Sequence, residues 1–385
     1  MTNKANNQER SAIEWSGECA MLWSSANDFV ASHSKMEAVR SLIPTDSGLD
    51  EQVCKQVAEL GWFGVALPES YEGAGMDAIA LAALAEPMGR GLLGSPFVAT
   101  TLAGQLLLAL GDEAQKKAWL PKLATGKTIG TLALLEPNGS WDLSTPTSTA
   151  RKDGKGYVLD ARKHQVLDGS RADVLLVSAL LEGKAAVFVI ERSALPAGAL
   201  TRHTLIDETR RAHALNVDAL HVDASALLCA GDTVAALGRI SRLGALLIAA
   251  EMAGGTHGVM ELTLEYLRTR KQFGKLIGSY QALKHPMVDL LNDYERGRSL
   301  VYAAATAFAL DPDSRRTESL VRMAKAQTGE TFTEAVDRCV QFHGAIGFTY
   351  ECHAQLYFRR AQWSEYAFGD AMHHRLRLQG LLLDS

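Results

Sequence analysis

A short basic turn between two long helical segments constrains the fold more than any other part of this sequence. An apolar segment covering about residues 239–268 leads into the turn, and a second helical segment covers about residues 280–310. Gly274 and Gly278 permit a tight reversal of chain direction between them. The pattern therefore predicts a helical hairpin within a bundle that buries the apolar faces of both helices.

The turn carries residue types that suit a phosphate-bearing ligand. Arg270 and Lys271 place two cations at the bend, and the planar guanidinium of arginine favours bidentate contacts with phosphate. Phe273 adds a flat aromatic face beside them. From these residues alone, a helical hairpin with a solvated basic turn is an equally good interpretation.

Composition limits the partners and the compartment. The chain has 385 residues, a hydrophobic fraction of 47% and a net charge of −5, so we expect a globular protein that binds neither nucleic acid nor an acidic membrane. Five scattered cysteines without a CxxC pair favour a reducing compartment, and residues 1–10 show no signal peptide. We therefore expect a cytoplasmic protein, and the spacing of its histidines predicts no metal site.

Hydrophobic periodicity changes twice along the chain. Residues 1–128 read as helical, with Asp112 as a helix N-cap. Residues 129–232 contain strand signals and two hairpin turns, at 153–156 and 182–184. Residues 233–385 are helical again. The predicted α+β multidomain fold has an N-terminal helical domain, a central β-barrel or sandwich and a C-terminal four-helix bundle.

Several of these segments resemble the acyl-CoA dehydrogenase family, and the resemblance covers essentially the whole chain. Residues 270–275 read Arg-Lys-Gln-Phe-Gly-Lys and are followed by Gln281, while residues 341–347 are similar to the family pattern Gln-x-x-Gly-Gly-x-Gly. The resemblance implies FAD and oxidation of an acyl-CoA thioester to the 2-enoyl-CoA. In that reaction a carboxylate removes the α-proton and a hydride leaves for the flavin.

The resemblance also implies which residues reach the adenine and pyrophosphate of a neighbouring subunit's FAD. The matching positions here are Arg270, Phe273, Gln281, Gln341, Gly344 and Ala345. Ala345 departs from the pattern because the family has a second glycine there.

Residues that would hold the flavin ring and perform proton abstraction are replaced. Leu135 and Leu167 stand where the family has hydroxyl side chains, and Gln165 stands where it has an aromatic ring. Phe368 occupies the position of the usual catalytic glutamate, so we assign no catalytic residue. Some members of the acyl-CoA dehydrogenase family carry the base at another position, which falls near residues 244–245 of this chain. These residues are glycine and alanine, which have no titratable side chain. Asp370 is an alternative as a relocated base, or it is a capping or interface aspartate.

This pattern of losses resembles subunits of bacterial heteromeric acyl-CoA dehydrogenases of the steroid type. It implies a subunit that completes the FAD site of a catalytic partner chain, most simply in an α2β2 heterotetramer that binds an acyl-CoA substrate. Two alternatives stay open: a self-sufficient homo-oligomeric flavoenzyme with a relocated base, and a flavin-free acyl-CoA-binding or scaffold protein.

Overall fold

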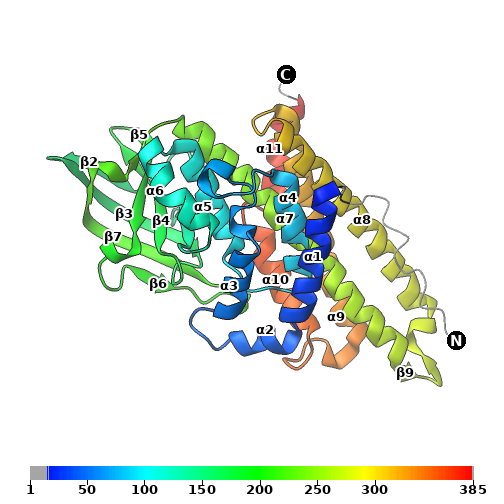
Figure 1. The fold of residues 1–385 in the computed structure, drawn as a ribbon. Coiled ribbons are helices and arrows are strands. Elements are labelled where there is room, and N and C mark those ends of the chain that lie inside the picture. The colour runs from blue at the N-terminus through cyan, green and yellow to red at the C-terminus, as the bar shows by residue number, and fades with distance from the viewer. Residues whose placement is uncertain (1–14, 16, 384–385) are drawn as a thin grey trace.

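The computed structural model describes Trp15 and residues 17–383. It confirms the expected order of a helical region, a sheet and a second helical region, with the sheet at one end of the molecule (Figure 1). The expectation that residues 1–10 contain no signal peptide concerns a segment outside the described residues.

The first region consists of helices that end in well-formed caps. The Asp112 side chain accepts a hydrogen bond from the Gln115 backbone, and the Gln115 side chain accepts one from the Asp112 backbone, each at 2.8 Å. This capping box confirms the predicted N-cap. The helices are α1 (Gly17–His33), α2 (Met36–Leu42), α3 (Glu51–Glu59), α4 (Ala78–Arg90), α5 (Phe97–Leu110) and α6 (Glu113–Ala124).

The central region is one mixed sheet. Both predicted hairpins are present, since β2 pairs antiparallel with β3 and β4 pairs antiparallel with β5. The strand order is β6-β7-β3-β2-β4-β5-β8, with β1 paired parallel to β4. The strands are β1 (Gly130–Ala133), β2 (Thr149–Asp153), β3 (Gly156–Leu167), β4 (Val174–Leu181), β5 (Lys184–Glu191), β6 (Leu200–Arg202), β7 (Ala212–Asp223) and β8 (Leu227–Leu228).

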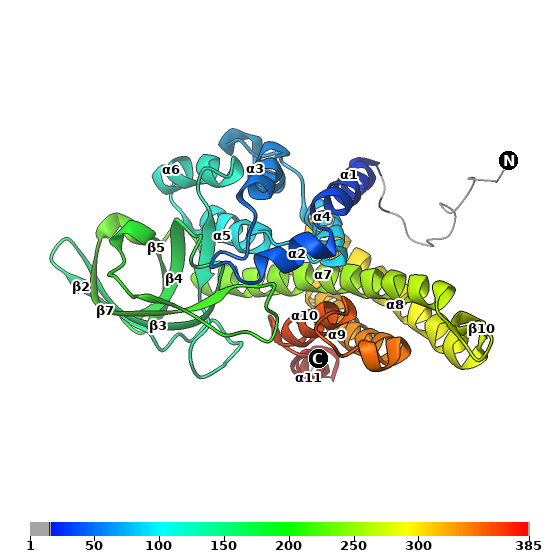
Figure 2. The ribbon, with the colours of Figure 1, turned by 90° about the horizontal axis from the view of Figure 1, so that it is seen from below.

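The second helical region is built around α7, which runs from the sheet to the far end of the molecule (Figure 2). Beyond α7 the chain turns through the short strands β9 (Lys271–Gln272) and β10 (Lys275–Leu276) and returns along α8, as predicted. The helices are α7 (Thr233–Thr269), α8 (Gln281–Leu310), α9 (Arg315–His343), α10 (Ala354–Tyr366) and α11 (Ala371–Leu383).

Helix α4 packs directly on α7 although the two are distant in sequence. A Cβ atom added at Gly254 would lie 1.8 Å from the Glu86 carbonyl oxygen, and one added at Gly89 would lie 1.9 Å from the Glu251 carbonyl oxygen. The two glycines therefore let the backbones touch. Helix α7 is long and apolar enough to cross a membrane, but 61% of its most apolar window is buried inside the protein, as in the central helix of a bundle.

Candidate functional site

The basic turn lies at the end of the helical hairpin that is remote from the sheet (Figure 2). Phe273 and Gly274 have φ values of 54° and 76°, the left-handed pair that a two-residue hairpin turn requires. Phe273 is 91% exposed. Arg270 and Gln281 are also exposed, so the turn presents a cation, an aromatic face and an amide at the surface of the chain.

The second predicted element reaches the same end of the molecule. The ring of His343, the last residue of α9, stacks on Tyr266 of α7 with centroids 4.5 Å apart. Gly344 follows with φ 66° and ψ −146°, a conformation essentially restricted to glycine. Gln341 and Ala345 are exposed on either side of it. The structure thus places all six predicted cofactor positions at one end of the bundle.

The four altered positions are brought together at the opposite end of α7. Leu135, the β3 residues Gln165 and Leu167, and Phe368 come from three segments, and all line one cavity of about 390 Å³ between the sheet, α5 and α10. The rest of its lining is predominantly apolar: Ala99, Leu102, Thr131, Leu132, Leu134, Trp141, Leu143, Thr204, Leu205, Ile206, Ser241, Gln362, Trp363, Tyr366 and Ala367.

A bulge in β3 forms one wall of this cavity. The register between β3 and β7 shifts between Lys163 and Val166, and Gln165 adopts φ 53° within the bulge. The neighbouring His164 N–H donates to the carbonyl of Leu135 at 2.9 Å. Bulges commonly re-aim a side chain beside a functional site, and this one brings β3 against the segment that follows β1.

Glu136, next to Leu135, organises the loop that follows it. Its buried carboxylate accepts hydrogen bonds from Thr147 and Ser148 and forms an ion pair with the fully buried Lys163. Burial alone would raise the pKa of Glu136, but Lys163 and these donors hold the pKa below its usual range. The loop between Glu136 and Thr147 carries Trp141 into the cavity wall.

Phe368, at the position where the resemblance implies a catalytic base, packs against α7. Its backbone has φ 58°, a strained conformation for an aromatic residue. A Cβ added at Gly244 would lie 2.3 Å from the Phe368 ring. Phe368 and Gly244, at the two positions where the resemblance implies a base, therefore lie against each other, and neither carries a titratable group.

A buried lysine holds the loop around Phe368. Lys325 is fully buried, and its ammonium donates to the carbonyls of Glu365 at 3.0 Å and Gly369 at 2.9 Å. Burial lowers the pKa of Lys325 to about 8, against the opposing effect of nearby Glu365 and Asp370. No sequence signal pointed to this residue.

Both carboxylates beside Phe368 are engaged at the start of α11. Asp370 accepts the N–H of His373 at 2.7 Å, and Glu365 accepts the N–H of Ala371 at 3.0 Å. Neither residue lines the apolar cavity. Asp370 therefore sits where its carboxylate caps the helix.

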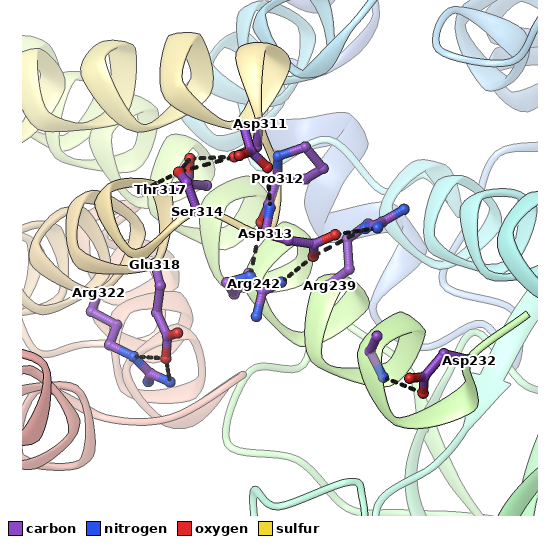
Figure 3. A network of polar contacts seen from close by, with 11 residues as sticks. Asp232, Arg239, Arg242, Asp311, Pro312, Asp313, Ser314, Thr317, Glu318 and Arg322 are labelled. Carbon is purple, nitrogen blue, oxygen red and sulfur yellow. Dashed lines mark hydrogen bonds and ion pairs between the residues drawn. The ribbon is translucent and has the colours of Figure 1, made fainter.

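A second cleft, of about 260 Å³, meets the apolar cavity at Phe368. Three arginines line it: Arg242, Arg322 and Arg377. Figure 3 shows Arg242 beside Asp313, at 2.7 Å, and Arg322 beside Glu318, at 2.6 Å. Among the described residues, none of the His, Cys, Asp and Glu side chains gather in threes around a possible metal position.

A buried charge network joins the sheet to the bundle beside the cavity. Arg210 pairs with Glu251 of α7, and Arg360 of α10 pairs with Asp207. Asp168, which follows Leu167, is buried close to both pairs. Burial raises the pKa of Asp168 to about 6 even though the arginines oppose the shift.

The family resemblance implies two hydroxyl side chains that hold a flavin ring. At those two positions in the cavity wall, Leu135 and Leu167 offer no side-chain hydrogen bond. Ser241, in the cavity wall, and Arg270, at the far turn, are separated by about 44 Å of helix at 1.5 Å per residue. A single dinucleotide would have to span that length to reach both places.

Comparison with known proteins gives the same relatives for both helical regions. Residues 16–127 match the acyl-CoA dehydrogenase N-terminal domain, and residues 238–379 match the acyl-CoA dehydrogenase C-terminal domain. Acyl-CoA dehydrogenase IpdE2 of Mycobacterium tuberculosis is 30% identical over 357 residues, which cover 90% of this chain and 92% of the relative.

Of two similar solved structures, the first is described as a steroid ACAD and the second as a complex. The Tcur3481–Tcur3483 steroid ACAD has a TM-score of 0.85 and 29% identity, covering 95% of this chain and 98% of its own. The ChsE4–ChsE5 complex from Mycobacterium tuberculosis has a TM-score of 0.87 and 26% identity, covering 96% and 99%.

Proposed function

This chain belongs to the acyl-CoA dehydrogenase family, whose cofactor is FAD, and from that premise we propose that it is the base-lacking subunit of a heteromeric member. Its basic turn would bind the adenine and pyrophosphate of an FAD whose ring lies in a catalytic partner chain. The partner would supply the carboxylate that removes the α-proton and the groups that hold the ring.

One observation carries this proposal: the convergence of all four altered positions on one apolar cavity. These positions come from three segments of the chain and line one cavity. Their replacements would together remove the ring-binding hydroxyls, the aromatic wall and the base from a single place. The remote turn, in contrast, keeps its cation and aromatic ring. The losses therefore follow one half of a shared cofactor site.

Symmetry favours a hetero-oligomer over a homo-oligomer for a chain with these residues. In a homo-oligomer each interface contains the same residues, so every site would combine a complete turn with an incomplete ring pocket. A partner with an intact ring pocket and base makes half of the sites complete. We therefore propose an α2β2 heterotetramer with one FAD for each pair of unlike chains.

The substrate class rests on the similar proteins. A similar structure described as a steroid ACAD supports a CoA thioester with a bulky, steroid-derived acyl group. The reaction of the complex would be α,β-dehydrogenation of that acyl-CoA, in the cytoplasm.

Native mass measurement with flavin quantification tests the assembly. The proposal expects unlike chains in equal number and half as many FAD molecules as chains. A homotetramer of this chain with four FAD molecules and acyl-CoA turnover would show the self-sufficient enzyme instead. A complex that never binds flavin would show the scaffold protein.

Phe368 provides a second test. Because a phenyl ring accepts no proton, we expect the chain alone to show no acyl-CoA oxidation with an artificial electron acceptor. Turnover by the chain alone that disappears in Asp370→Asn, but persists in the control Asp313→Asn, would demonstrate a relocated base and overturn this assignment.

A further inference from the structure

Tyr266 lies between the two segments that we expect to contact a neighbour's cofactor. It is half-buried in the last turn of α7, immediately before the basic turn at 270–281. The second segment covers residues 341–347 and follows the end of α9. Tyr266 is not among the six predicted cofactor positions, so its part in the site follows from its contacts alone.

The backbone of Tyr266 holds the start of the basic turn. Its carbonyl accepts the N–H of Arg270 at 2.9 Å, and the Arg270 carbonyl accepts the N–H of Ile277 at 2.9 Å. A Cβ atom added at Gly278 would lie 2.7 Å from the Leu267 carbonyl oxygen, so the returning chain packs directly on α7. The direction in which Arg270 leaves α7 is therefore fixed by the last turn of that helix.

The side chain of Tyr266 contacts the other segment. Its ring stacks on the ring of His343, with centroids 4.5 Å apart and planes inclined by 21°. Its hydroxyl donates to the His343 carbonyl at 3.4 Å. That carbonyl belongs to the peptide group that leads into Gly344, whose positive φ of 66° starts the turn after α9. Tyr266 therefore touches both the ring and the peptide group that precede Gly344.

His343 is itself held firmly by α9. It is 7% exposed, and its Nδ1 donates to the Cys339 carbonyl at 2.7 Å. A Cβ atom added at Gly347 would lie 2.2 Å from the Val340 carbonyl oxygen, so the chain beyond His343 folds back onto α9. The second segment is thus fixed to α9 as the basic turn is fixed to α7, and Tyr266 contacts both.

We propose that Tyr266 is a positioning residue that holds the basic turn and the segment 341–347 in one arrangement, so that the two bind a single dinucleotide as a unit. It acts through Arg270 and His343 and does not touch the cofactor. The inference rests on the proposed function, since it takes the dinucleotide to be the FAD of the partner chain. It adds the contact through which the two segments depend on each other.

Preorganisation gives the physical reason. Two binding segments that are already held in their bound arrangement lose less conformational freedom when the ligand binds. Without the Tyr266 side chain, the basic turn would keep its hairpin pairing and His343 would keep its bond to α9. Only the mutual arrangement of the two segments would loosen. The loss should therefore appear in the affinity for the dinucleotide.

Two substitutions separate the contributions of the ring and the hydroxyl. Tyr266→Leu removes both, and it should raise the Kd of FAD in the assembled complex by about 2- to 13-fold, the range for a lost aromatic pair. Tyr266→Phe keeps the stacked ring, so it should restore most of the affinity and leave a loss of about twofold, because a hydrogen bond of 3.4 Å is weak.

ADP reports the same end of the cofactor without the flavin ring. Its Kd is measured by competition with FAD for the stripped complex. Because the proposed effect is confined to the adenine and pyrophosphate end, Tyr266→Leu should weaken ADP and FAD by the same factor. A general loosening of the complex would weaken FAD more than ADP, since FAD contacts more of the protein.

Tyr302 provides a matched control in the same helical region. It is half-buried on α8, and its ring pairs with Trp15 at a centroid distance of 5.2 Å. Tyr302→Leu therefore removes an aromatic pair that touches neither segment. It should lower the free energy of unfolding much as Tyr266→Leu does, and it should leave the Kd of FAD and of ADP unchanged.

A double substitution tests whether Tyr266 acts through Arg270. If Tyr266 holds Arg270 in place, part of its effect disappears once the Arg270 side chain is absent. Tyr266→Leu combined with Arg270→Ala should then raise the Kd of FAD by less than the product of the two single effects. A Kd equal to that product would show that the two residues act independently.

The outcomes separate this inference from the proposed function. If Arg270→Ala weakens FAD but Tyr266→Leu does not, or if Tyr266→Leu and Tyr302→Leu have equal effects on FAD, the positioning role is wrong and the proposed function stands. An unchanged Kd in Arg270→Ala overturns the proposed function itself. If Tyr266→Leu does not assemble, the same measurements on Tyr266→Met decide, because methionine fills irregular space in a core more readily.

Discussion

Replacing Arg270 with alanine isolates the contribution of this chain to a neighbour's cofactor. Among the described residues, the Arg270 guanidinium forms no hydrogen bond or ion pair, and the residue is exposed. Its backbone N–H donates to Tyr266 and its carbonyl accepts from Ile277, both at 2.9 Å, and alanine keeps both bonds. The unfolding free energy of the chain should therefore change by no more than about 0.5 kcal/mol.

The loss should appear in FAD affinity. A hydrogen bond to a charged group contributes about 1.5–3 kcal/mol, so Arg270→Ala should raise the Kd of FAD in the assembled complex by about 10- to 150-fold. Arg270→Lys keeps the charge but loses the planar guanidinium, so its Kd for FAD should lie between those of the unsubstituted complex and the Arg270→Ala complex. The Kd is measured by flavin fluorescence during re-addition of FAD to stripped complex.

An exposed arginine in the sheet serves as the control. Arg151→Ala removes the same charge from β2, far from the hairpin turn, and should leave the Kd of FAD unchanged. Native mass measurement confirms that each variant assembles. If assembled Arg270→Ala complex binds FAD within twofold of the unsubstituted complex, the turn does not contact the cofactor and the division of the site described above is wrong.

Three further substitutions test the fold. In the folded chain the pKa of Asp168 is about 6, above its usual value, so ionisation of this carboxyl destabilises the folded state as pH rises. Asp168→Asn should therefore raise the free energy of unfolding by up to about 3 kcal/mol at pH 8 and change it little at pH 4. Denaturant unfolding at the two pH values measures this difference. Gly254→Ala should lower the free energy of unfolding by at least about 3 kcal/mol, because the added methyl group would clash with the α4 backbone. Gly104→Ala is the control: its added methyl group meets ordinary contacts at 3.5 Å, so the substitution should be neutral or stabilising. Equal effects of the two substitutions would contradict the close packing of α4 on α7. Asp112→Ala should cost about 1 kcal/mol through loss of the cap, and an unchanged melting temperature would show that the cap is dispensable.

Backbone strain occurs at two of the sequence departures, Gln165 and Phe368. Non-glycine residues with positive φ include Gln165, Asp168, Phe273 and Phe368. Such conformations cost of order 1–3 kcal/mol each and persist only where the surroundings impose them. Here the β3 bulge, the hairpin turn and the Lys325 contacts impose them, so Gln165, Phe273 and Phe368 are held in defined backbone geometry.

Local sequence patterns determined the elements of this protein. The apolar periodicity of the segment before Arg270 and the glycines after it were sufficient for the α7–α8 hairpin, and the turn residues at 153–156 and 182–184 were sufficient for two strand pairs. Asp112 marked the start of α6 in the same way. These features depend on neighbours in the chain, which is why they can be read without the fold. The short strands β1, β6 and β8 and the helix α11 gave no such signal, because the first three exist only through pairing with strands distant in sequence.

Only the tertiary structure decided how the altered residues are arranged in space. The sequence identified Leu135, Gln165, Leu167 and Phe368 one by one, but only the fold placed them around a single cavity and set the Phe368 ring on Gly244. It also revealed Lys325 and the arginine-lined cleft, which no motif indicated. Burial, contact and cavity shape depend on residues tens to hundreds of positions apart, and their free energies arise only when the chain has closed around them.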